Sequence, residues 1–193
     1  MTASIPGTPG ARAADGGRRE LVLAAALGTF ARYGYQKTSM EDVARAAAIS
    51  RPGLYLMFGS KQELFTAAVT LALNQGLAAA SEVLTDTTRP LRDRLLDAFD
   101  WWTGRYIGAM SHEVNSMAAE YADMLGPVVA EYPSRFAAVL RAALAEPPDA
   151  APAARPAEIA QTLISTSIGI KHEVTTRDAF LERLATAIDL IIR

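Results

Sequence analysis

The chain has 193 residues, 50% of them hydrophobic and 21% charged, which is typical of a folded globular protein. It contains no cysteine, so disulfide scaffolds, thiolate metal sites and thiol catalysis are excluded. The formal net charge is −2, but residues 1–70 hold eight Lys or Arg against five Asp or Glu, a balance of +3, which leaves −5 for residues 71–193. This asymmetry predicts that a polyanion binds the N-terminal part.

Residues 1–17 are rich in glycine, proline, alanine and threonine and offer few large apolar side chains for burial, so we expect a flexible arm. Beyond the arm, apolar residues recur at helical spacing, and no segment alternates as a strand does. The sequence therefore predicts an all-α protein of about nine helices, with one domain over residues 18–64 and a second over residues 65–193. No apolar run approaches the ~18–20 residues that span a membrane, and we expect a cytoplasmic protein.

The first predicted helix carries Val22, Ala26, Phe30 and Tyr33 on one face and ends near Gly34. The next segment, Thr38-Ser39-Met40-Glu41, is a capping-box pattern, in which the Thr38 hydroxyl accepts a hydrogen bond from the N–H of Glu41. A second, short helix is therefore expected from about Ser39. Its predicted apolar side consists of Met40, Val43, Ala44 and Ala47.

A third short helix is predicted after Ser50, its expected cap, with Pro52 in the first turn and Leu54 and Phe58 facing inward. Ser60-Lys61-Gln62-Glu63 forms another capping box, which opens a longer fourth helix. Two short helices joined by a tight turn over residues 38–58 are typical of a helix-turn-helix, whose second helix projects into a DNA major groove.

The second domain is predicted to consist of further helices separated by a proline-rich loop. The expected segments are a helix from Thr88 to about Met110, shorter helices over residues 113–124 and 127–145, a loop over 146–156, and two final helices over 157–171 and 177–192. The two final helices carry apolar residues on more than one side, which favours a second subunit as an additional partner. The predicted dimer interface comprises Ile164, Ile168, Phe180, Leu184, Ile188 and Ile191.

The N-terminal third resembles the TetR family of transcriptional regulators. The matching positions are Phe30, Tyr33-Gly34-Tyr35, Thr38 to Ala44, Ile49-Ser50-Arg51, Leu54-Tyr55, Phe58, Ser60-Lys61 and Glu63-Leu64. The resemblance implies a DNA-binding domain over residues 18–64 and an effector-binding and dimerisation domain over residues 65–193. It also implies a repressor that binds double-stranded DNA at a palindromic operator as a homodimer and is released by a small-molecule effector.

Carried over position by position, the resemblance predicts a DNA-binding surface around the second helix of the motif. Its predicted members are Thr38, Ser39, Arg51, Pro52, Gly53, Tyr55, Leu56, Met57 and Lys61. Arg51 is the strongest candidate for a base contact, because a guanidinium addresses guanine O6 and N7 together; the alternative is a phosphate contact. Tyr55 either contacts the DNA or braces the reading helix, and Lys61 either contacts a phosphate or is simply an exposed lysine.

Three departures from the family pattern fall within the motif. Ala48 stands where relatives usually have glycine, and a left-handed conformation there costs roughly 1 kcal/mol for a residue with a Cβ. Gly53 replaces a residue with a hydroxyl, and Leu56 and Met57 replace aromatic or histidine positions. The sequence therefore predicts that the protein binds DNA, but it does not predict the operator sequence. Arg12, Arg18 and Arg19, in and just after the arm, are further candidates for contacts with the DNA, and the alternative for Arg12 is a solvated tail.

The resemblance further implies an effector pocket in the second domain, suited to an apolar or aromatic small molecule. The predicted lining consists of Phe99, Trp102, Tyr106, Met110, Met117, Tyr121, Met124 and Phe136, and the alternative is that these residues form core. Neither His-Glu pair, at residues 112–113 and 172–173, is completed by a second histidine, and nucleotide-binding and nucleophile motifs are missing, so we expect no metal, no cofactor and no enzyme. A structural helical dimer that binds DNA non-specifically is the remaining alternative.

Overall fold

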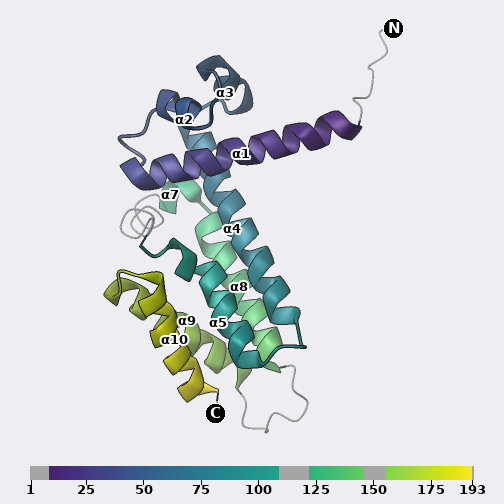
Figure 1. Ribbon diagram of the computed structural model, residues 1–193, viewed down its shortest axis with the longest axis vertical. Helices are drawn as coiled ribbons and strands as arrows, with labels where there is room; N and C mark the ends of the chain where they lie inside the picture. Colours follow the sequence, from purple (N-terminus) through teal and green to yellow (C-terminus); the bar gives the residue numbers. More distant parts are fainter. Residues whose placement is uncertain (1–8, 109–121, 146–154, 193) are drawn as a thin grey trace. The chain divides into compact units, whose positions relative to one another are not determined.

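The computed structural model describes residues 9–108, 122–145 and 155–192, and within these ranges the chain is helical with no strand (Figure 1). The prediction of an all-α fold is confirmed. The chain divides into two compact units, Met1–Ala72 and Leu73–Arg193. Helix α4 (Lys61–Thr85) contributes residues to both units. The predicted domain boundary after residue 64 lies within the first turn of this helix.

The first unit contains three helices before α4. These are α1 (Pro9–Tyr33), α2 (Met40–Ala46) and α3 (Arg51–Met57). The prediction of a flexible arm is wrong for residues 9–17, which belong to α1. Proline fits the first turn of a helix, and the Ala-Arg-Ala-Ala segment that follows has high helix propensity.

The end of α1 follows from Gly34, whose φ of +79° is a left-handed conformation that glycine adopts without strain. Three residues of the predicted inner face of α1 are buried, but Tyr33 is 52% exposed, so its inward assignment is wrong. The glycine turns the chain, and Tyr35 takes the inner position instead. Its ring centroid lies 5.7 Å from that of Phe30 and 4.9 Å from that of Phe65.

The second unit is a bundle formed by the later part of α4 and the following helices (Figure 1). These are α5 (Leu91–Trp102), α7 (Ala122–Leu125), α8 (Val128–Ala145), α9 (Pro156–Glu173) and α10 (Arg177–Ile191), with a 3₁₀ turn, η1 (Gly104–Tyr106), after α5. The core is aromatic where α5 meets α8. The rings of Phe99 and Phe136 meet edge to face with centroids 5.3 Å apart, and Trp102 stacks on Phe136 at 4.6 Å.

Helix α5 ends at Trp102, whereas a helix as far as Met110 was predicted. Gly104 accounts for the difference, because glycine disfavours helix and this one is buried. A Cβ on Gly104 would lie 3.2 Å from Cδ1 of Phe180 and 2.5 Å from Oδ1 of Asp100. The glycine therefore allows α10 to approach the end of α5 closely.

The two final helices match their predicted ranges closely, but half of the predicted dimer interface is internal. Phe180, Leu184 and Ile188 are fully buried in the core of this chain's own second unit, so their assignment to a subunit interface is wrong. Ile164 and Ile191 are partly buried against the same core. Ile168 is different, because 52% of it is exposed in the single chain.

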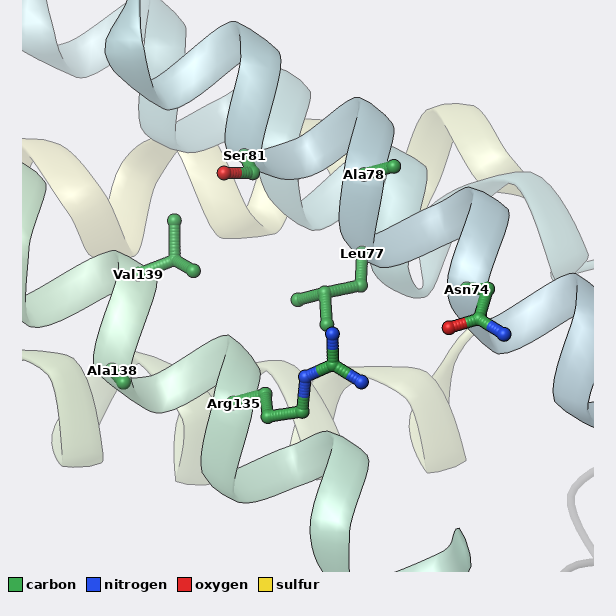
Figure 2. A pocket seen from close by; sticks show the side chains of 7 residues that line it. All are labelled: Asn74, Leu77, Ala78, Ser81, Arg135, Ala138 and Val139. Carbon is green, nitrogen blue, oxygen red and sulfur yellow. The ribbon is translucent and has the colours of Figure 1, made fainter.

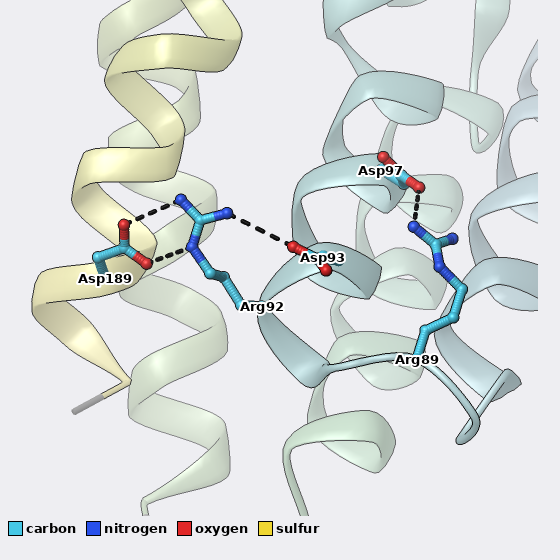
Figure 3. A network of polar contacts seen from close by, with 5 residues as sticks. All are labelled: Arg89, Arg92, Asp93, Asp97 and Asp189. Carbon is cyan, nitrogen blue, oxygen red and sulfur yellow. Dashed lines mark hydrogen bonds and ion pairs between the residues drawn. The ribbon is translucent and has the colours of Figure 1, made fainter.

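Two arginine–aspartate pairs join α5 to α10 with opposite polarity. Near the start of α5, Arg92 donates through Nε and Nη2 to the Asp189 carboxylate at 2.5 and 2.9 Å (Figure 3). Near the end of α5 the roles reverse, and Arg177 on α10 donates to Asp100 at 2.7 and 2.5 Å. The hydrogen bonds that they donate to Asp189 and Asp100 raise the pKa of Arg92 and Arg177, respectively. This exchange of signs favours the antiparallel register, because a parallel pairing would place like charges together.

Helix α4 is the one helix among the described residues that is long and apolar enough, by length and composition alone, to cross a membrane. A core helix passes the same test, and the burial of α4 supports that assignment. Leu64 and Phe65 are buried in the first unit, and Leu77 and Leu84 are buried in the second. These four residues of α4 therefore belong to the cores of the two units.

Candidate nucleic-acid interface

Helix α2 is capped by Ser39, one residue later than predicted. The Ser39 hydroxyl accepts a hydrogen bond from the Asp42 N–H, and the Asp42 carboxylate accepts from the Ser39 N–H at 3.0 Å. The bonds from Ser39 lower the pKa of Asp42. Because the Asp42 carboxylate already accepts from the Ser39 N–H, and the Asp42 N–H is taken by the Ser39 hydroxyl, Ser39 is poorly placed to bind a phosphate.

Thr38 is buried and faces the main chain, not the solvent. Its hydroxyl donates to the Gly34 carbonyl at 2.8 Å, and its N–H donates to the carbonyls of Gly34 and Tyr35. The prediction that Thr38 caps α2 is therefore wrong, because the side chain closes the turn after α1. We accordingly leave Thr38 out of the surface proposed below.

The turn between α2 and α3 is a Schellman motif built around Ala48. The Ile49 N–H donates to the Ala44 carbonyl at 3.0 Å, and the Ala48 N–H donates to the Arg45 carbonyl at 3.2 Å. Ala48 has a φ of +52°, as the comparison with glycine at this position predicted. The motif therefore keeps its turn at the expense of local backbone strain.

Helix α3 begins and is anchored as predicted. Ser50 accepts a hydrogen bond from the Gly53 N–H at 3.2 Å, and Leu54 and Phe58 are buried. Gly53 lies close to this cap, since a Cβ on it would come within 3.0 Å of the Ser50 Oγ. The missing side chain at position 53 is thus consistent with the packing at the start of α3.

The outer face of α3 presents one cation, one phenol and one large aliphatic side chain. Leu56 is 90% exposed and Tyr55 is 43% exposed. Arg51 is exposed on the same face as Tyr55, with its Cζ 5.7 Å from the Tyr55 ring and its Nε 4.0 Å from a Glu41 carboxylate oxygen. A pair this long and this open to solvent holds Arg51 only weakly, so the guanidinium is free to exchange Glu41 for a nucleic-acid acceptor.

Lys61 is engaged by the protein itself. Its Nζ donates to the main-chain carbonyls of Tyr35 and Thr38 at 3.0 and 3.1 Å and lies 4.3 Å from the centroid of the Tyr35 ring. Neither sequence interpretation, a phosphate contact or a simple exposed lysine, describes this arrangement. The ammonium group instead fixes the turn between α1 and α2 to the start of α4.

The start of α4 matches its predicted cap in part. Ser60 Oγ accepts from the Glu63 N–H at 3.1 Å, but the Glu63 carboxylate accepts from the Gly59 N–H at 2.9 Å, one residue before the expected partner. Sequence reasoning named Arg19 only as a candidate DNA contact and missed its hydrogen bond within the protein, in which Nη1 donates to the Met57 carbonyl at the end of α3 at 3.2 Å. No local pattern links two residues so far apart in the sequence.

The second unit contains a pocket between α4 and α8, with a volume of about 550 Å³ (Figure 2). Its lining consists of Asn74, Leu77, Ala78, Ser81, Arg135, Ala138 and Val139. The side chains of Leu77 from α4 and Arg135 from α8 both extend toward the middle of the view, and Asn74 lies at one end. The walls are mainly apolar, with a few polar groups that can orient a ligand.

The residues predicted to line an effector pocket differ from those that line the pocket between α4 and α8. Phe99 and Phe136 are buried against each other, and Trp102 stacks on Phe136. Tyr106 and Met124 are half-buried, and burial raises the pKa of Tyr106. Met110, Met117 and Tyr121 lie outside the described residues. The core alternative therefore describes Phe99 and Phe136, and none of the described members lines the pocket between α4 and α8.

Together, the capped pair of short helices and the exposed face of the second one form a helix-turn-helix, which is followed by a separate helical unit. Residues 22–68 match the family model described as bacterial regulatory proteins, tetR family. Over these residues the chain is similar to the TetR family of transcriptional regulators. The matched residues include α2, α3 and the start of α4, so the similarity covers the helix-turn-helix of the first unit.

The relatives are similar to part of this chain in sequence, whereas the solved structures are similar to nearly the whole chain in fold. The uncharacterized HTH-type transcriptional regulator YfiR of Bacillus subtilis is 34% identical over 89 residues, 39% of this chain and 43% of the relative. The HTH-type transcriptional activator FasR of Mycolicibacterium smegmatis is 33% identical over 87 residues, 44% of this chain and 40% of the relative. The similarity thus spans less than half the length of these relatives.

The fold similarity extends over nearly the whole chain. The reduced form of NemR from Escherichia coli superposes with a TM-score of 0.74 at 17% identity, covering 91% of this chain and 97% of that one. A TetR transcription regulator from Haloarcula marismortui gives a TM-score of 0.76 at 15% identity, covering 92% and 97%. At these identities the likeness concerns the fold alone.

Proposed function

We propose that the protein is a homodimeric repressor that reads a palindromic operator through α3 and is released by a small-molecule effector. The observation that carries the proposal is the exposed face of α3, where Arg51, Tyr55 and Leu56 project from a helix anchored by buried Leu54 and Phe58. Arg51 supplies a bidentate base contact, and Leu56 supplies an apolar contact to a thymine methyl. Ser39, Pro52, Gly53 and Met57 border this surface.

Two copies are needed because one short helix reads only a few base pairs. A two-fold dimer presents two reading helices to half-sites about one helical turn of DNA apart. We propose that α9 and α10 supply the interface through their exposed faces. Ile168, 52% exposed, and Leu190, 63% exposed, are large apolar side chains there that this chain leaves open, and Ile164 borders the core beside them.

We propose the pocket between α4 and α8 as the effector site. Its walls suit an apolar molecule, and Arg135 with Asn74 suits an acidic or hydrogen-bonding group on that molecule. Helix α4 contributes residues to this pocket and, at its start, to the reading unit. Binding of an effector that prefers one position of α4 shifts the population away from the DNA-binding state. A cytoplasmic location follows from such a role.

Selection of bound duplexes from a random pool at fixed salt tests the proposal. Enrichment of a palindrome with half-sites about one turn apart is the expected result. Recovery of an unenriched pool would favour the alternative, a helical dimer that binds DNA without sequence preference.

A further inference from the structure

Arg19 on α1 contacts the carboxyl-terminal end of α3 in two ways. Its Nη1 donates to the Met57 carbonyl at 3.2 Å, and its Cζ lies 4.2 Å from the centroid of the Phe58 ring. Met57 is the last residue of α3, so its carbonyl is among those that a helix leaves without an internal partner. A cation at this end also interacts favourably with the helix dipole. The guanidinium therefore satisfies the end of α3 and stacks on a residue that anchors it.

Helix α3 has particular need of such a contact because it is only seven residues long. Isolated helices shorter than ~12–15 residues are marginal in water, so α3 depends on its neighbours. Ser50 caps its first turn and Leu54 is buried in its middle. The last turn carries Leu56, which is almost fully exposed and contributes little packing. Arg19 and the buried Phe58 hold this turn.

We propose that Arg19 is a positioning residue that fixes the last turn of α3 and, through it, the operator positions that Leu56 and Met57 face. The proposal rests on the function of α3 as the reading helix given above. It gives Arg19 a role different from a direct DNA contact, because the guanidinium is already committed to a carbonyl and a ring. Arg18, its exposed neighbour with the same charge, provides a matched control.

Amide hydrogen exchange on the free full-length protein tests the positioning role without DNA. The Phe58 N–H donates to the Leu54 carbonyl at 2.9 Å and reports on the last turn of α3. In Arg19→Met we expect this amide to exchange about 5-fold faster, since local opening governs exchange. Arg19→Lys should fall between the two, because an ammonium donates to the carbonyl but lacks the planar stacking of a guanidinium. Unchanged exchange in Arg19→Met, or an equal effect of Arg18→Met, would overturn the proposal.

Duplex selection and salt titration of the same variants test the consequence for reading. Arg19→Met should relax preference at the positions faced by Leu56 and Met57, keep the preference given by Arg51, and leave the slope of log affinity against log salt unchanged. A slope lower by about one with all preferences intact would show instead that Arg19 binds a phosphate. If the unmodified protein enriches no sequence, the proposal that α3 reads DNA is wrong. The exchange experiment then still tests whether Arg19 fixes the last turn of α3.

Discussion

The cationic side chains inside the first unit make different kinds of contact from those inside the second unit. In the first unit, Lys61 donates to the carbonyls of Tyr35 and Thr38, and Arg19 donates to the carbonyl of Met57. Both units have aromatic rings in their cores, but in the second unit arginine side chains also pair with aspartate side chains between α5 and α10, beside one arginine–carbonyl bond from Arg94 to Leu84. Cations that bind main-chain carbonyls fix the path of the backbone, which is what a short reading helix requires.

The difference predicts that substitutions in the second unit act mainly on stability, whereas substitutions in the first act mainly on DNA binding or on the local backbone. In the second unit, a lost ring leaves a cavity in a densely packed core. In the first unit, a lost contact changes the position of α3 or the side chains that α3 presents to DNA. Four substitutions test this contrast.

The largest effect is expected for Phe136→Ala. Phe136 is buried between Phe99 and Trp102, and replacing a buried phenylalanine by alanine costs about 3–5 kcal/mol of unfolding free energy. Urea unfolding measures the loss. Arg141→Ala, an exposed position on α8, is the control and should change little. An equally stable Phe136→Ala protein would contradict the assignment of this ring to the core.

The next largest effect is expected for Arg51→Ala, and it concerns binding. Loss of a bidentate base contact should weaken binding to the selected duplex by about 1–3 kcal/mol. Urea unfolding should stay within the error of the measurement, because Arg51 is exposed and its pair with Glu41 is long. A large loss of stability with unchanged DNA affinity would reverse the roles given to the two units.

Lys61→Met distinguishes a structural lysine from one that contacts DNA. Removing the two bonds to carbonyls should lower the unfolding free energy by about 1 kcal/mol, and the salt slope of DNA binding should not change. Lys37→Met, at an exposed position, is the control for charge alone. A salt slope of DNA binding that is reduced by about one, together with an unchanged unfolding free energy, would instead support the phosphate contact, one of the two interpretations from the sequence.

The smallest effect is expected for Ala48→Gly, and it is a gain. Relief of the left-handed strain at φ +52° exceeds the entropy cost of glycine, so the unfolding free energy should rise by about 0.5–1 kcal/mol. Ala46→Gly provides the opposite control, because Ala46 is helical and exposed and should lose about 1 kcal/mol. A loss in both variants would show that the Schellman turn stores no strain.

Much of the first unit was predictable because the sequence patterns that specify its helix caps and turns are local. The cap at Ser50, the turn at Gly34 and the inward positions of Leu54 and Phe58 follow from side chains a few residues apart. Ser39 and Thr38 show the limit of such signals, since adjacent hydroxyl residues both fit a cap and only the backbone decides between them.

The second unit was less predictable because its contacts join distant residues. An apolar stripe on α10 fits a subunit interface and an internal core equally well, and Phe180, Leu184 and Ile188 are internal. The end of α5 depends on how closely α10 approaches Gly104, which helical periodicity does not reveal. The contact of Arg19 with Met57 escaped sequence reasoning for the same reason.

The most direct test of the central claim, that α3 reads DNA from a fixed position, is duplex selection run in parallel on the unmodified protein and Arg51→Ala. We predict that the unmodified protein enriches a palindrome and that Arg51→Ala enriches the same palindrome with preference lost at one symmetric position in each half-site. Identical enriched sequences from both proteins, or no enrichment from either, would contradict the account.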